Sequence, residues 1–150
     1  MKTTTSISLI VSMILLLACT NKKTDAETDL KENQAEVEER VRPAASGGTS
    51  AAYFTYTNSL STADTLISVQ SDFAGMTQVH ESYETEDGMM GMREQKGIIL
   101  QPGEEVQFKQ GGLHIMLMGL SQELKSGDTV IVRLNLAMAG EVSKRLPVKP

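Results

Sequence analysis

Thiols, imidazoles and aromatic rings are all scarce in this chain of 150 residues. It has one Cys, two His and no Trp, and aromatic residues make up 4% of it. A single Cys excludes an internal disulfide, a CxxC redox pair and a zinc site built on cysteines. Basic residues are also in the minority, 14 Lys and Arg against 19 Asp and Glu, which gives a net charge of -5. An acidic chain without a basic cluster is a poor partner for nucleic acid.

Methionine, by contrast, is abundant, with nine residues in the chain. Hydrophobic residues make up 40%, enough for one modest core, and the length suits one domain. Met is a common filler of irregular cores, and this is the interpretation we give to Met76 and Met138. Met89, Met90 and Met118 are left without an assigned role.

The N-terminus has the pattern of a bacterial export signal. Lys2 precedes a mostly apolar run over residues 7–17, which is too short to span a membrane and suits a signal peptide. The run ends in Leu16-Leu17-Ala18-Cys19, which resembles a lipobox. We therefore expect residues 1–18 to be a lipoprotein signal peptide and Cys19 to be acylated, which anchors the protein to the extracytoplasmic (periplasmic) face of a bacterial membrane. The alternative is a plain signal peptide with an incidental Cys.

The chain after Cys19 divides into a tether and a domain. Residues 19–49 are polar and end in Pro43 and Gly47-Gly48, which is typical of a linker. From residue 50 the pattern favours strands: residues 130–138 alternate between apolar and other side chains, and turn signals occur at Pro102-Gly103 and Ala139-Gly140. We therefore predict an all-β antiparallel sandwich over residues 50–150.

Both histidines lie in methionine-rich segments, His80 to Arg93 and Gly111 to Leu120. On a strand, His114, Met116 and Met118 would share one face, because side chains alternate. Thioether and imidazole are neutral donors that suit Cu(I) and are poor ligands for Mg, Ca or Mn. They also suit an oxidising compartment, where paired thiols would form a disulfide. The alternative is that the methionines fill the core and the histidines make structural hydrogen bonds.

These two segments resemble the periplasmic copper chaperone PCu(A)C family. So do Ala51-Ala52-Tyr53, Leu100-Gln101-Pro102-Gly103 and the stretch from Leu124 to Val130. The family pattern is His, ten residues, Met, twenty-one residues, His-x-Met. The second interval matches here, from Met92 to His114-Ile115-Met116, but eleven residues separate His80 from Met92. We interpret the difference as one extra residue within Ser82–Glu86.

The resemblance implies a cupredoxin-like (immunoglobulin-like) sandwich that binds one Cu(I) in a His2Met2 site. The ligands it implies are His80, Met92, His114 and Met116, with Met90 as a substitute for Met92. It further implies a carrier that delivers Cu(I) to the dinuclear copper centre of cytochrome c oxidase, often beside a thiol-based assembly protein.

Two other functions compete with delivery to the oxidase. One is a periplasmic copper-sequestering or resistance protein without a dedicated client. The other is an enzyme, which we do not expect, because neither His lies near a GxSxG motif and a blue-copper centre would need a Cys ligand. The acidic residues Glu81, Glu84, Glu86 and Asp87 are expected to form a negative rim at the site.

Overall fold

The structure, a computed structural model, describes residues 36–150. The predicted signal peptide and the acylated Cys19 lie outside these residues and stay predictions. Within the described range there is no helix long and apolar enough to cross a membrane. All the regular structure there is β, in strands β1 (Arg40–Val41), β2 (Thr49–Thr57), β3 (Asp64–Gln70), β4 (Ala74–Glu84), β5 (Met90–Gln95), β6 (Ile98–Leu100), β7 (Glu105–Phe108), β8 (Leu113–Leu120), β9 (Thr129–Leu136) and β10 (Gly140–Pro147).

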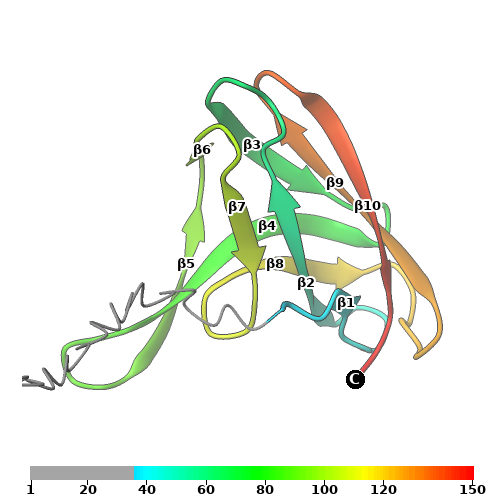
Figure 1. The fold of residues 1–150 in the computed structure, drawn as a ribbon. Coiled ribbons are helices and arrows are strands. Elements are labelled where there is room, and N and C mark those ends of the chain that lie inside the picture. The colour runs from blue at the N-terminus through cyan, green and yellow to red at the C-terminus, as the bar shows by residue number, and fades with distance from the viewer. Residues whose placement is uncertain (1–35) are drawn as a thin grey trace, which may run out of the picture. The chain divides into compact units, whose positions relative to one another are not determined.

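The strands form two antiparallel sheets that pack face to face (Figure 1). In the larger sheet the order is β1-β2-β8-β4-β5, and β7 also pairs with β2. The smaller sheet has the order β10-β9-β3-β6. The prediction of an all-β antiparallel sandwich is therefore confirmed.

The core lies between the two sheets and follows the alternation seen in the sequence. Val130, Val132, Leu134 and Leu136 of β9 are all buried, as the period-2 pattern predicts. On the other sheet, Ile115 and Leu117 of β8 are fully buried and belong to the same core cluster. The residues of β8 between them, such as Met116, therefore lie on the outer face of the larger sheet.

Two methionines predicted to fill the core are in fact exposed. Met76 lies on β4 with 54% of its surface exposed, and Met138 lies in the turn between β9 and β10 with 69% exposed. Strand β9 ends at Leu136, so the alternation does not continue to Met138. On β4 the neighbour that enters the core is Val79, and Met76 has the opposite parity in the strand.

The folded unit begins earlier than the predicted boundary at residue 50. Arg40 and Val41 of β1 pair with Tyr53 and Ala52 of β2. Val41 is completely buried. The predicted tether over 19–49 is therefore too long at its C-terminal end, because this short strand adds to the edge of the larger sheet.

A buried carboxylate ties the start of β3 to the turn after β9. Asp64 accepts hydrogen bonds from the backbone N–H groups of Thr65, Met138 and Ala139 at 2.7, 2.8 and 2.9 Å. Burial opposes ionisation of Asp64, but these donors outweigh it and hold its pKa below the usual range. The stability that Asp64 contributes is therefore present at neutral pH and is lost as the pH falls through this lowered pKa.

Candidate metal centre

The two histidines of the chain face each other across neighbouring strands. His80 of β4 pairs directly with His114 of β8, although 33 residues separate them in the sequence. Their ring centroids are 6.2 Å apart with an interplanar angle of 63°. A metal–nitrogen bond of about 2 Å would place one ion roughly 3.2 Å from each centroid, so a bridged pair spans up to roughly 6.4 Å. The observed separation is just inside this limit, which one ion meets only with its two nitrogen ligands on nearly opposite sides, so a four-coordinate ion would need the two rings to move closer together.

Methionines flank this histidine pair on the same face of the sheet. His114 and Met116 alternate with the core residues Ile115 and Leu117, so both lie on the outer face. On β5, Met92 pairs with Ser82, which is two positions beyond His80 on β4. Met92 therefore lies on the same face as the two histidines.

The β4–β5 hairpin distinguishes Met92 from its neighbours. Five residues, 85–89, connect the two strands, and the hairpin extends away from the sandwich (Figure 1). With eleven residues between His80 and Met92, the hairpin register places Met92 opposite Ser82. Gly91 has the opposite parity and pairs with Tyr83, whose ring a Cβ at Gly91 would meet at 2.6 Å. Met90 has the parity of Met92 but pairs with Glu84, farther from His80.

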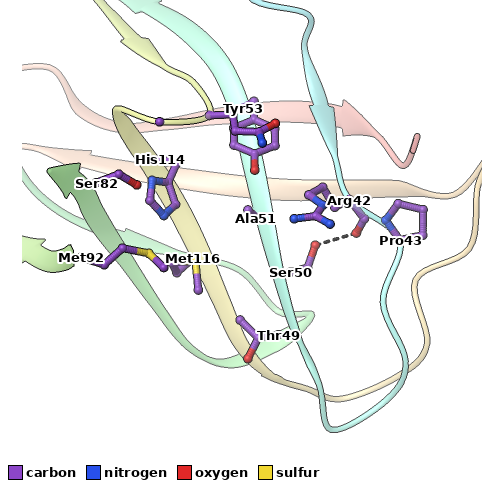
Figure 2. Close-up of a pocket in the computed structure, with 12 residues that line it drawn as sticks. Arg42, Pro43, Thr49, Ser50, Ala51, Tyr53, Ser82, Met92, His114 and Met116 are labelled. Atoms are coloured by element: carbon purple, nitrogen blue, oxygen red, sulfur yellow. Dashed lines mark hydrogen bonds between the residues drawn. The ribbon is translucent and has the colours of Figure 1, made fainter. Parts of the chain in front are cut away.

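Met92, His114 and Met116 line one pocket with a volume of about 310 Å³. Figure 2 shows the side chain of Met92 pointing toward Met116, next to His114. His80 is not among the lining residues and reaches this group only through its partner His114. Met90 is likewise not among them. The structure thus brings three of the four predicted ligands to one cavity, with the fourth alongside.

Sequence reasoning did not predict the rest of the pocket lining. Arg42, Tyr53 and Ser82 all contribute to it, and Arg42 follows directly on the short strand β1. Ser82 could have been found from the strand period, since it is two residues from His80. Arg42 carried no such signal, because it lies in the segment predicted to be a linker, and its backbone N–H donates to the carbonyl oxygen of Ala51 at 3.0 Å.

Hydrogen bonds to the imidazoles determine which ring nitrogens are available. His114 Nδ1 lies 2.9 Å from the carbonyl oxygen of Gly112, which assigns the N–H to Nδ1 and leaves Nε2 as a free acceptor. A backbone partner of this kind orients a histidine ligand and fixes its tautomer. His80 Nε2 lies 3.1 Å from the side-chain amide oxygen of Gln78, so Gln78 contacts one of the two ring nitrogens of His80.

Glu81 does not contribute a free carboxylate to the negative rim predicted around the site. Glu81 has the opposite strand parity to His80 and forms an ion pair with Arg93 at 2.7 Å. The hydrogen bond from Arg93 is the largest effect on the pKa of Glu81 and holds it below the usual range. Glu84, Glu86 and Asp87 remain exposed at the end of the hairpin.

The donor set limits which ion the site can hold. In residues 36–150, no group of three or more His, Cys, Asp or Glu side chains is arranged to bind a metal. The thioethers of Met92 and Met116, which line the pocket beside His114, are the further donors that a metal here could use. Two thioethers and two imidazoles are uncharged and soft, which suits a monovalent ion such as Cu(I) better than Mg, Ca or Mn.

The fold is shared with solved copper-related domains. The chain is similar to the apo PCuAC domain from PmoF1, with a TM-score of 0.61 and 20% identity over 76% of this chain and 93% of that one. It is also similar to the copper-bound PCuAC domain from PmoF2, with a TM-score of 0.58 and 24% identity over 75% of this chain and 90% of that one. At these identities the likeness establishes the fold, which is the cupredoxin-like sandwich that the resemblance implied.

Comparison of sequences identifies the family. The family described as "Putative lipoprotein LpqE-like" matches residues 33–148. A curated relative from Leifsonia xyli subsp. xyli (strain CTCB07), "Putative lipoprotein Lxx21020", is 33% identical over 107 residues, which cover 71% of this chain. The chain spans 64% of that relative's length. The chain therefore belongs to the LpqE-like lipoprotein family, on a PCuAC-like fold.

Proposed function

We propose that this protein is an extracytoplasmic copper chaperone that binds one Cu(I) through His80, Met92, His114 and Met116. The observation that carries the proposal is the position of the only two imidazoles of the chain, 6.2 Å apart, beside a pocket lined by two thioethers. One of the solved domains that share this fold is copper-bound. A third, from Deinococcus radiodurans, is described as a CuI form, with a TM-score of 0.53 and 22% identity over 83% of this chain and 87% of that one.

The exposure of one ligand favours a carrier over a store or an enzyme. Met92 has 62% of its surface exposed, while His114 has only 6%. An acceptor could therefore displace Met92 first and take the ion in steps while His114 still holds it. Transfer of this kind needs no redox change and no proton transfer at the thioether.

The acceptor we propose is the copper centre of cytochrome c oxidase, reached directly or through a thiol-based assembly protein. Cu(I)-loaded protein is to be mixed anaerobically with the apo copper-binding domain of the oxidase, and copper measured in each after separation. We expect copper to move to the oxidase domain. Retention on the donor, together with copper sensitivity and normal oxidase in a deletion strain, would instead indicate copper sequestration.

We also propose that acylation of Cys19 holds the protein at the membrane. The support is the lipobox-like sequence Leu16-Leu17-Ala18-Cys19 and the lipoprotein family to which the chain belongs. In the mature wild-type protein, mass spectrometry should find residues 1–18 removed and acyl chains on Cys19, and a Cys19→Ser variant should lack the acyl chains and still bind Cu(I). A mature protein whose Cys19 carries no acyl chain would rule out this anchor.

A further inference from the structure

A second group of thioethers lies on the same outer face, one step farther along β4 and β8. Met76 of β4 pairs directly with Met118 of β8, and Gln78 and Met116 form the next pair on this face. His80 and His114 are the pair after that. The outer face of these two strands therefore carries a row in which a methionine pair leads, through Met116, to the histidine pair.

These methionines do not belong to the core. Met76 is 54% exposed, and Met118 and Met116 are each partly exposed. The outward face of an antiparallel sheet usually carries polar residues, because that face is in contact with water and not with the core. Three thioethers on such a face are therefore not explained by packing.

The spacing allows these sulfur atoms to share one ion. Residues directly opposite in an antiparallel pair have Cβ atoms about 4.5–5.5 Å apart, and diagonal neighbours lie about 7–8 Å apart. Two sulfurs bound to one ion at about 2.3 Å each can be no more than about 4.6 Å apart. The three rotatable bonds of Met allow the side chains of Met76 and Met118 to converge to this distance, with Met116 at the diagonal position.

We propose that Met76 and Met118, with Met116 as a shared third ligand, form a second Cu(I)-binding position that contains only thioethers. This proposal rests on the proposed function, because Cu(I) held at this second position would pass to the histidine pair through Met116. The step is a ligand exchange: the sulfur–copper bonds to Met76 and Met118 break as nitrogen–copper bonds to His80 and His114 form, the bond to Met116 is kept, and the ion remains Cu(I). Because Met116 is bound at the histidine site once that site is filled, this position should fill second, and it should refill the histidine site after that site has given up its ion.

The test follows each methionine methyl group separately. The full chain, labelled with [methyl-13C]methionine, is titrated anaerobically with Cu(I) and followed by NMR. The first equivalent should shift the methyl signals of Met92 and Met116, and further Cu(I) should shift those of Met76 and Met118. Met138 is the internal control, because it is 69% exposed and lies in the turn between β9 and β10, away from this face.

Variants separate this site from the histidine site. In a Met76→Leu/Met118→Leu protein, the second phase should be lost while the first equivalent still binds; a Met138→Leu control should keep both phases. Met and Leu have similar volumes, so the fold should tolerate these changes. In a His114→Asn variant the first phase should be lost, and the shifts of Met76 and Met118 should persist.

Two results would overturn the thioether site. One is the absence of any shift at Met76 and Met118 in both the wild type and His114→Asn. The other is a shift at Met138 as large as theirs, which would show unspecific binding. If instead the wild type lacks the first phase but Met76 and Met118 still respond, the proposed histidine site is wrong and the thioether site stands.

Discussion

A His114→Asn variant is expected to lose more than about 100-fold in affinity for Cu(I). Removal of a residue that merely supports a metal ligand costs about 10–100-fold, so removal of a ligand should cost more. The choice of Asn follows from the hydrogen bond of His114 Nδ1 to Gly112 O, since the Asn side chain amide can still donate there. The variant thus removes Nε2 while keeping the bond that holds the start of β8.

The measurement is a competition titration with a chromophoric Cu(I) chelator, run beside thermal unfolding of the apo-protein. An unchanged Cu(I) affinity in a variant with a wild-type unfolding temperature would exclude His114 as a ligand. If the unfolding temperature falls strongly, a His80→Asn variant gives the same test, because His80 is only partly buried.

The second expected result is a difference between two methionines of the same strand. Met92→Leu should weaken Cu(I) binding by more than about 100-fold, whereas Met90→Leu should leave it unchanged. The two residues are matched in exposure, 62% and 68%, and in strand parity. They differ in register, since Met92 pairs with Ser82 beside His80 and lines the pocket, and Met90 pairs with Glu84.

This comparison also tests how the extra residue between His80 and Met92 is accommodated. If the hairpin loop absorbs it, Met92 keeps its place opposite Ser82. The reverse result, with Met90→Leu weakening binding and Met92→Leu harmless, would mean that β4 and β5 pair in another register when copper is bound. Equal losses of Cu(I) affinity in the two variants would mean that strand register does not determine which of the two methionines binds the ion.

Much of the fold follows from local patterns in the sequence. The alternation over Val130–Leu136 predicts a strand with one buried face, and Pro102-Gly103 and Ala139-Gly140 mark turns that the structure contains. The sharing of one face by His114, Met116 and Met118 likewise follows from the two-residue period of a strand. These are properties of single strands and need no knowledge of their neighbours.

Features that depend on how one strand pairs with another could not be predicted in this way. Strand β1 has only two residues, and its place is determined by pairing with β2 rather than by its own composition. Met76 was assigned to the core because Met is a common filler, but its position opposite Met118 on the outer face depends on the β4–β8 register. The same register brings His80 opposite His114, which sequence spacing alone does not determine.

X-ray absorption spectroscopy of the Cu(I)-loaded protein tests the central proposal most directly. Protein loaded with one equivalent of Cu(I) should give a copper coordination shell of two nitrogen and two sulfur atoms. The same measurement on His114→Asn should show the loss of a nitrogen ligand. A shell of sulfur atoms alone at one equivalent, or one unchanged in His114→Asn, would contradict a site built from His80, Met92, His114 and Met116.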